Sequence, residues 1–264
     1  MIGVTGLTGE DLNAALASMA HDDRIELMKL LEAKEQRFNQ SLLFRMFPDE
    51  TTRWDNGETF HARHLYPKHL EFFRVGATHR ERCLMAANRV GKTFGGGGYE
   101  TALHLTGLYP DWWEGRRFDT PIRAWAAGKT NETTRDIVQP VLLGSIKDNG
   151  VRKTVTGTGM IPGWLLGYPT WKSGVPDLVD VIKVQHTSGG WSTLGIKSYQ
   201  QGRGSFEGTA QHVIWGDEEP PLDVYGEMII RTATTNGLAM LTFTPLEGIS
   251  DTVMQFLPKD ENAL

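Results

Sequence analysis

The chain has 264 residues, of which 39% are hydrophobic and 22% charged, and its net charge is −5. This composition is ordinary for a globular protein, and the length suits one large domain or two small ones. The acidic balance excludes a protein that holds nucleic acid by bulk charge alone, so any DNA contact has to come from a local patch. Cys83 is the single cysteine, which excludes an intrachain disulfide and fits a reducing cytoplasm. The N-terminus lacks the features of a signal peptide and no apolar run approaches the length of a membrane span, so we expect a soluble protein.

The first part of the chain has a helical pattern. Between residues 9 and 47, apolar side chains recur at three- and four-residue steps, and Asp22 or Asp23 is placed to cap the start. An amphipathic helix that packs on the main domain is the simpler interpretation, and an arm that links domains or binds a partner is the alternative. We expect an N-terminal helical arm at residues 1–50, ahead of a main domain at residues 51–264.

Beyond residue 66, short apolar runs alternate with helical patterns. The predicted strands are 82–87, 122–128, 179–187, 191–199, 212–217 and 238–244. A turn at residues 188–190 predicts that the third and fourth of these strands form a hairpin. We expect irregular structure at residues 149–176. Strands that alternate with helices imply an α/β fold with a mainly parallel central sheet flanked by helices, although periodicity does not determine the strand order.

One loop has the pattern of a phosphate-binding site. It comprises Ala86, Ala87, Asn88, Arg89, Val90, Gly91, Lys92 and Thr93. Backbone N–H groups of such a loop curl around phosphates, the lysine reaches the β and γ oxygens, and the hydroxyl faces Mg²⁺. Alanine replaces the usual first glycine, and four glycines follow at residues 95–98, each of which disfavours helix by about 1 kcal/mol. A flexible turn that contains Gly-Lys-Thr by chance is therefore the alternative for this motif taken alone.

A second motif follows an apolar strand in the sequence HVIWGDEEPP. Asp217 is placed to hold Mg²⁺ through water, and Glu218 to orient or deprotonate an attacking water. A strand that simply ends in a charged loop would look the same. The Gly-Lys-Thr loop and this carboxylate pair together favour a nucleoside triphosphatase, in which the acidic residue ends a strand neighbouring the loop.

A third motif is LTFTPLEG, where Thr244 ends a predicted strand. A small polar residue at this place senses the γ-phosphate in motor ATPases, so Thr244 is a candidate for coupling hydrolysis to movement. A strand end that caps the following turn is the alternative.

AANRVGKT, VIWGDEE and FTPLEG, in that order, resemble the ATPase domain of the tailed-bacteriophage terminase large subunit, the motor that packages viral DNA. The resemblance runs from about Tyr66 to Gly248. It implies the P-loop NTPase fold, ATP and Mg²⁺ as cofactors, and hydrolysis that drives double-stranded viral DNA into a procapsid. It also implies a homo-oligomeric ring on the phage portal, a small terminase subunit as partner, no membrane, and a location in the bacterial host cytoplasm and on the procapsid during packaging.

The resemblance assigns further roles to single residues. Arg89 is similar to the catalytic arginine of the family, which contacts the γ-phosphate, and a solvated loop arginine is the alternative. The family has an adenine-binding motif, usually with a glutamine, near Tyr66. This chain carries Lys68 and His69 there, and Tyr66 is a possible adenine contact; a helix that starts with Pro67 in its first turn is an equally good interpretation.

The resemblance also implies parts that this chain is expected to lack. Residues 249–264 are far too short for the nuclease domain of the family, so we expect an excised ATPase domain or a truncated protein. Arg203 and Arg231 are candidates for an arginine supplied by a ring neighbour, although a structural role is the simpler interpretation of each.

Two other functions are alternatives to a packaging motor. They are a helicase-like ATPase stimulated by nucleic acid and an ATP-binding scaffold without turnover.

Overall fold

The helical segment predicted at residues 9–47 forms two separate helices in the computed structural model, which describes residues 18–54, 56–246 and 248–257. Helix α2 spans His21–Gln40 and α3 spans Leu42–Arg45. Asp22 and Asp23 lie inside the first turn of α2 rather than ahead of it. Residues 9–17 lie outside the described part of the chain. Residues 1–41 and 42–264 form two compact units, so residues 42–50 belong with the second unit.

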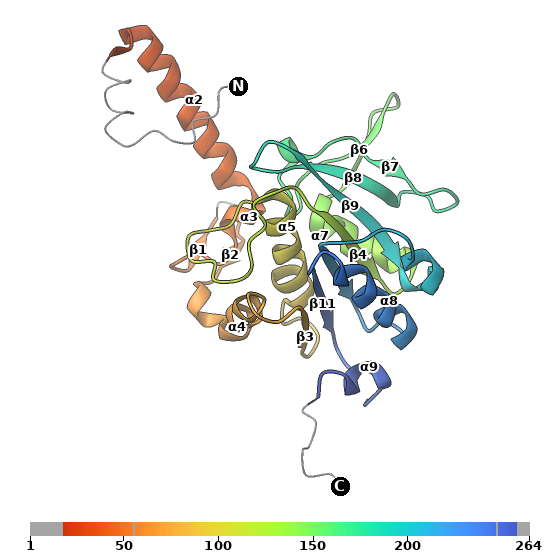
Figure 1. Cartoon of the computed structure of the whole chain (residues 1–264). Coiled ribbons are helices and arrows are strands. Elements are labelled where there is room, and N and C mark those ends of the chain that lie inside the picture. The colour runs from red at the N-terminus through yellow and green to blue at the C-terminus, as the bar shows by residue number, and fades with distance from the viewer. Residues whose placement is uncertain (1–17, 55, 247, 258–264) are drawn as a thin grey trace. The chain divides into compact units, whose positions relative to one another are not determined.

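A seven-stranded sheet forms the centre of the second unit (Figure 1). Its strands are β3 (Glu81–Met85), β4 (Arg123–Gly128), β7 (Thr170–Trp171), β8 (Val179–Gln185), β9 (Trp191–Ser198), β10 (Val213–Asp217) and β11 (Leu238–Phe243). Their order is β3-β11-β10-β4-β9-β8-β7. The first five strands in this order pair in parallel, whereas β8 and β7 are antiparallel. The predicted mainly parallel α/β sheet and the hairpin of β8 and β9 are confirmed.

Two predictions about the chain path need correction. The strand that leads into the phosphate loop, β3, does not pair with the acidic strand β10, because β11 lies between them. The segment 149–176 is not wholly irregular. It contains β6 (Lys153–Val155), which pairs with β5 (Ile146–Asp148), and the edge strand β7.

Shorter elements complete the second unit. Two-residue strands β1 (Thr52–Arg53) and β2 (Thr59–Phe60) pair with each other, and the remaining helices follow in chain order. They are η1 (Arg63–Leu65), α4 (Pro67–Val75), η2 (Lys92–Gly98), α5 (Tyr99–Thr106), α6 (Asn131–Thr133), η3 (Thr134–Val138), α7 (Gln139–Leu143), η4 (Gly163–Leu165), η5 (Tyr199–Gln201), η6 (Arg203–Phe206), α8 (Leu222–Ala233) and α9 (Asp251–Met254). Within the described residues, no helix has the length and apolar character that crossing a membrane requires.

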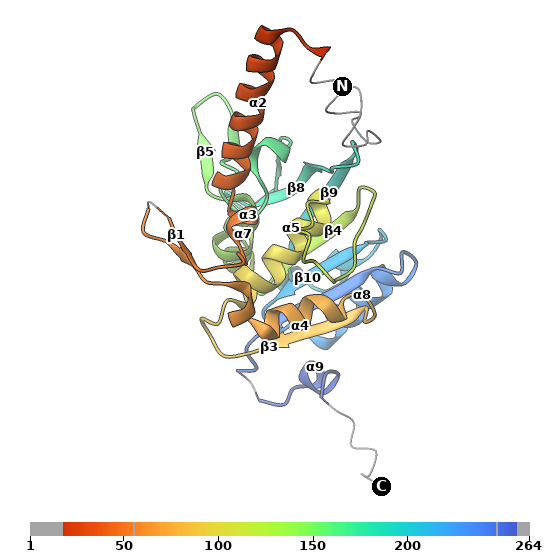
Figure 2. The ribbon, with the colours of Figure 1, turned by 90° about the vertical axis from the view of Figure 1, so that its left-hand side faces the viewer.

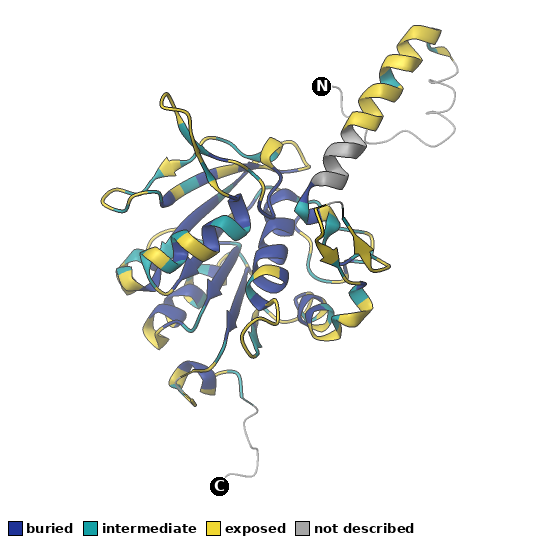
Figure 3. Ribbon diagram, turned by 180° about the vertical axis from the view of Figure 1, so that it is seen from behind, coloured by how far each residue is buried: buried dark blue, intermediate teal, exposed yellow. Residues whose placement is uncertain are grey.

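Helices cover both faces of the sheet (Figure 2). Strand side chains alternate between the faces, as the strand period of two requires. In β10, Trp215 packs with α5 and α7, whereas Ile214 packs with Val224 and Met228 of α8. Burial on both sides explains why the central strands are almost wholly buried in Figure 3, while the outer faces of several helices are exposed.

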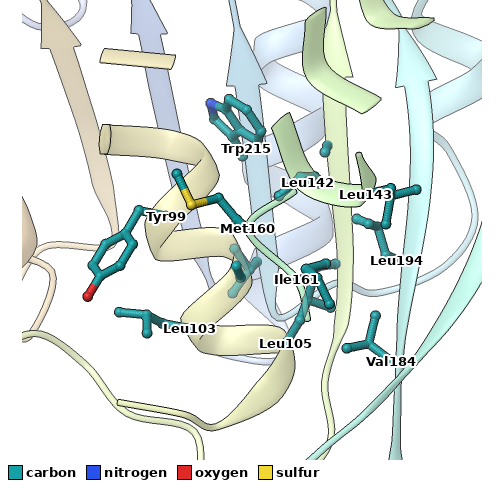
Figure 4. Packing of buried hydrophobic residues seen from close by; sticks show 14 of the residues in the cluster. Tyr99, Leu103, Leu105, Leu142, Leu143, Met160, Ile161, Val184, Leu194 and Trp215 are labelled. Carbon is teal, nitrogen blue, oxygen red and sulfur yellow. The ribbon is translucent and has the colours of Figure 1, made fainter. Parts of the chain in front are cut away.

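The larger core lies on the face covered by α5 and α7, where Leu103, Leu142 and Leu194 are fully buried (Figure 4). The glycine run 95–98 lies within η2, which continues directly into α5. A side chain at Gly97 would collide with the indole of Trp215. The glycines therefore allow this helix to press against the sheet, which offsets their low helix propensity.

Candidate active site

The loop 86–93 leaves the end of β3 and turns sharply. The backbone N–H of Ala86 donates to Phe243 O at 3.3 Å, which joins the start of the loop to β11. Arg89 and Gly91 have left-handed backbones with φ of 63° and 83°. In the part of the chain that the structure describes, the N–H groups of residues 88–90 have no acceptor. A turn whose N–H groups lack acceptors is a nest for an anion.

Lys92 and Thr93 lie at the first turn of η2, directly after the left-handed Gly91. The Lys92 side chain folds back over the loop, where its ammonium group donates to Ala87 O at 3.3 Å. Lys92 is buried, because only 9% of its surface is exposed. The lysine charge and the positive end of the helix dipole are therefore both held at the concave side of the loop.

Asp217 ends β10 on the face that this helix covers, because it is two residues beyond Trp215. Two hydroxyl groups donate to Asp217 Oδ1, from Thr93 at 2.9 Å and from Thr242 at 2.7 Å. The indole N–H of Trp215 in turn donates to Thr242 Oγ1 at 2.8 Å. The aspartate is thus oriented by side chains from η2, β10 and β11.

Burial has the largest effect on the pKa of Asp217, because only 4% of the residue's surface is exposed. Desolvation raises the pKa of Asp217 to about 6, while the hydroxyl groups of Thr242 and Thr93 act in the opposite direction. Within the described residues, the Asp217 carboxylate forms no salt bridge, and the groups that donate to it are the hydroxyls of Thr93 and Thr242. A buried carboxylate of this kind suits a site for a cation.

Glu218 has a left-handed backbone with φ of 64°, which is uncommon for a residue with a side chain. Its N–H donates to Thr242 O at 3.0 Å. The hydroxyl of Tyr199 lies 3.0 Å from Asp217 O and 3.2 Å from Glu218 O. The backbone of the acidic pair is therefore held by Thr242 of the neighbouring strand β11 and by Tyr199, which follows β9.

Thr244 joins the end of β11 to the phosphate loop. Its hydroxyl lies 2.8 Å from Ala86 O and 2.9 Å from Asn88 Oδ1, so it donates to either of these acceptors. Further along the chain, Ser250 Oγ donates to the Glu219 carboxylate. The segment after β11 is therefore connected both to the phosphate loop and to the acidic loop.

These elements surround a cavity of about 830 Å³ at the carboxyl end of the parallel strands. The sequence-predicted residues that line it are Asn88, Arg89, Lys92, Thr93, Asp217, Glu218 and Thr244. Arg89 is exposed at the cavity wall. Ala86, Ala87, Val90 and Gly91 supply backbone to the loop without lining the cavity. The structure thus brings together three motifs that are far apart in the chain.

Tyr66 lies elsewhere. It packs edge-on against Phe47 at 5.6 Å between ring centroids and precedes Pro67, which starts α4. Tyr66 is not among the residues that line the cavity. His69, in the same helix α4, lies close to Gly91. Burial lowers the pKa of His69, and a hydrogen bond with the Gly91 backbone offsets part of this effect.

Arg203 and Arg231 both pair with one buried carboxylate. Arg203 Nε lies 3.1 Å from Glu227 Oε2, and Arg231 Nη2 lies 2.6 Å from Glu227 Oε1. Glu227 is 2% exposed, so two arginines neutralise a charge that would be costly to bury alone. This pairing gives each arginine a structural role within its own chain.

Sequence patterns did not single out Tyr199, Thr242 or Lys129, although all three line the cavity. Thr242 has a signal in hindsight, because it lies two residues before Thr244 and therefore on the same face of β11. Tyr199 and Lys129 directly follow strands β9 and β4, and their place beside the acidic pair depends on the strand order. That order is not contained in local periodicity.

Comparisons with known proteins show what the chain is similar to. Residues 83–263 match the family model described as terminase large subunit, T4likevirus-type, N-terminal. The chain is 36% identical over 266 residues to the terminase large subunit of Salmonella phage P22, covering 94% of this chain and 48% of that protein. It is 26% identical over 263 residues to the terminase large subunit of Enterobacteria phage LP7, covering 94% and 50%.

Among solved structures, the chain is similar to the large terminase ATPase domain of Thermus phage P74-26. The TM-score is 0.44 at 14% identity, and the similarity covers 74% of this chain and 70% of that one. The chain spans about half the length of the two phage relatives from Salmonella and Enterobacteria. The match of the family model over most of the chain, together with the identity to the Salmonella phage protein, shows that the chain belongs to the family of phage terminase large subunits.

Proposed function

We propose that this chain is the ATPase part of a DNA-packaging motor, which hydrolyses ATP with Mg²⁺ and so drives double-stranded viral DNA into a procapsid. The observation that carries the proposal is the hydrogen bond of 2.9 Å between Thr93 Oγ1 and Asp217 Oδ1. Thr93, the last residue of the phosphate loop, lies against the acidic strand at the wall of one cavity, and this supports a site for nucleotide hydrolysis.

The loop 86–93 would bind the triphosphate. The N–H groups of residues 88–90 lack acceptors among the described residues and would donate to phosphate oxygens. The ammonium group of Lys92 would leave Ala87 O and move to the β- and γ-phosphates. Arg89 is exposed at the same wall, so its guanidinium is available to neutralise charge on the transferred phosphoryl group.

Thr93 and Asp217 fit a magnesium ion. Asp217 is buried and its recorded partners are hydroxyl groups, which leaves its charge for a cation. Magnesium is typically held by one or two carboxylates together with phosphate oxygens and water, which agrees with a site that has no larger cluster of acidic ligands among the described residues. When bound, the ion would neutralise charge on the β- and γ-phosphates.

Glu218 would act on the attacking water. Glu218 lines the cavity next to Asp217, and its backbone is held in place by Thr242 and Tyr199. A carboxylate there can accept a proton from water and orient the water for in-line attack on the γ-phosphate. This role explains why an uncommon backbone conformation is retained at Glu218.

Thr244 would couple hydrolysis to movement, because its hydroxyl contacts the phosphate loop at Ala86 O and Asn88 Oδ1. A change in the loop on loss of the γ-phosphate would shift these contacts and the segment that follows β11. Double-stranded DNA, a ring of identical subunits on the phage portal and a small terminase subunit are the proposed partners, and the procapsid in the host cytoplasm is the proposed location. The adenine contact of Tyr66 stays a prediction, as does a second arginine from a ring neighbour.

Mg²⁺-dependent release of phosphate from ATP, measured with and without double-stranded DNA, tests the proposal. The wild-type chain should release phosphate, and Glu218→Gln should abolish release while leaving ATP binding nearly intact. Normal turnover in Glu218→Gln would remove Glu218 from its role. Binding without turnover in the wild-type chain would favour the scaffold, and stimulation by single-stranded nucleic acid alone would favour the helicase-like alternative.

A further inference from the structure

Tyr199 approaches the acidic pair from the face of the sheet opposite to the phosphate loop. It follows the last residue of β9 and packs with Ile214 and Val224. Its hydroxyl is within hydrogen-bond distance of Asp217 O and Glu218 O, at 3.0 and 3.2 Å. Burial raises the pKa of Tyr199 well above its usual range, so the hydroxyl keeps its proton, which it shares between these two carbonyl oxygens.

Gly216 leaves room in the sheet for the Tyr199 hydroxyl to reach the acidic pair. A Cβ atom at Gly216 would lie 2.6 Å from Tyr199 Oη, so a side chain there would push the ring away from the acidic pair. The tyrosine itself is well anchored. The next residue, Gln200, donates its N–H to Lys129 O at 3.1 Å, and the ring of Tyr199 packs on Phe206.

Glu218 needs external support for its backbone. A left-handed φ of 64° costs a residue with a side chain free energy, and such a conformation persists only where its surroundings hold it. Two contacts do so: the N–H of Glu218 donates to Thr242 O, and its carbonyl oxygen accepts from Tyr199. Without the tyrosine hydroxyl, the carbonyl of Glu218 has no donor among the described residues, and the peptide is able to rotate out of the left-handed region.

We propose that Tyr199 is a positioning residue for ATP hydrolysis, whose hydroxyl holds Glu218 in the left-handed conformation that directs its carboxylate into the cavity. The proposal rests on the proposed function, because it assigns Tyr199 an effect on turnover that passes through Glu218. Tyr199 does not contact the nucleotide in this scheme. It therefore affects the rate of the chemical step and leaves nucleotide affinity unchanged.

Tyr199→Phe removes the hydroxyl and keeps the ring. We expect kcat for phosphate release to fall about 10-fold, which corresponds to about 1.4 kcal/mol in activation free energy. The affinity for ATP should stay within about twofold, because the phosphate loop is untouched. Tyr225→Phe is the matched control. Tyr225 is buried to the same degree, and its hydroxyl donates to Glu81 Oε2 at 3.0 Å, away from the cavity.

Each variant loses the hydrogen bond of one tyrosine hydroxyl, so each should lose about 0.5–1.5 kcal/mol of stability in urea, whereas only Tyr199→Phe should lose turnover. In the Glu218→Gln background, Tyr199→Phe should have no further effect on residual turnover, since it acts through Glu218. A kcat for Tyr199→Phe that equals that of Tyr225→Phe would overturn the proposal. So would a loss of ATP affinity that accounts for the whole effect.

A crystal structure of Tyr199→Phe tests the proposal independently of activity. We expect φ of Glu218 to leave the left-handed region in this variant and to keep it in Tyr225→Phe. A left-handed Glu218 in Tyr199→Phe would overturn the proposal even if the variant were slow. If the wild-type chain released no phosphate, the proposed function would fail, and the conformation of Glu218 would still decide whether Tyr199 holds it.

Discussion

Thr93 Oγ1 donates to Asp217 Oδ1 at 2.9 Å, although the two residues are 124 positions apart in the chain. The contact joins the first turn of η2 to the end of β10, although β11 separates β10 from β3, the strand that precedes the loop. It brings a hydroxyl group and a buried carboxylate to one point on the wall of the cavity. The contact therefore links the phosphate loop, the helix that follows it and the core of the sheet.

Lys92→Ala should weaken nucleotide binding. The Lys92 ammonium is the one lysine charge that the loop itself holds, and a charge-assisted hydrogen bond to phosphate is worth about 1.5–3 kcal/mol, so affinity should fall roughly 10- to 100-fold. Fluorescence titration with a labelled ATP analogue measures the change. Lys147→Ala, at an exposed lysine outside the cavity, is the control. An unchanged affinity in Lys92→Ala would mean that the loop does not bind phosphate.

Thr242→Val should disorder Asp217. The substitution removes the hydroxyl that donates to Asp217 and leaves the indole N–H of Trp215 without its acceptor, so stability should fall by about 1–3 kcal/mol. The Mg²⁺ concentration needed for half-maximal turnover should rise. Thr134→Val is the control, because its hydroxyl donates to Thr130 O and, within the described residues, accepts no hydrogen bond. Equal urea midpoints for the two variants would contradict this role of Thr242.

Two glycine-to-alanine substitutions in helices should change the stability of the protein in opposite directions. Gly97→Ala places a methyl group against the Trp215 indole, which should cost about 1–3 kcal/mol through overpacking. Gly226→Ala in α8 meets nothing within 4 Å and should stabilise the protein by about 0.5–1 kcal/mol. Urea unfolding measures both. A neutral Gly97→Ala would show that η2 does not press on β10 as closely as described.

Stability should fall as the pH is lowered from about 7 to 5. Burial lowers the pKa of His104 below its ordinary value near 6.5, with Glu100 acting in the opposite direction, and burial lowers the pKa of three other histidines as well. At these four histidines the unfolded chain therefore takes up protons first as the pH falls through 6.5, and this favours unfolding. Asp217, whose pKa is raised to about 6, takes up its proton first in the folded chain and offsets part of the loss. Stability contributed by neutral histidine is fully present at higher pH.

Urea midpoints between pH 7.5 and 5.5 measure this loss, and His104→Gln should flatten it in part. His64→Gln, at an exposed position, should leave the slope unchanged. A midpoint that stays constant or rises on acidification would show that the buried histidines do not govern stability in this range.

Much of the site was predictable because its motifs are local. A loop of eight residues and a pair of carboxylates each carry their chemistry in a short stretch, and alternation along a strand places Asp217 and Thr242 on fixed faces. The glycine run looked unfavourable for a helix because propensity does not include packing. Contact with Trp215 supplies the reason for it.

What the sequence did not predict depends on contacts between distant segments. The insertion of β11 between β3 and β10 places Thr242 and Thr244 in the site, and the position of β9 beyond β4 brings Tyr199 to Glu218. The left-handed backbone of Glu218 has no sequence signal either, because glutamate rarely adopts it. Tyr66 is a candidate adenine contact because its aromatic ring can stack on a base, whereas its place in the aromatic cluster around Phe47 depends on tertiary packing.

A crystal structure with Mg²⁺ and a non-hydrolysable ATP analogue tests the central claim most directly. We expect the β- and γ-phosphates on the loop 86–93, with Thr93 Oγ1 bound to the metal and Asp217 within one water molecule of it. The carboxylate of Glu218 should face the γ-phosphate. A triphosphate bound away from this loop, or a metal ion out of reach of Thr93 and Asp217, would contradict the assignment of the site.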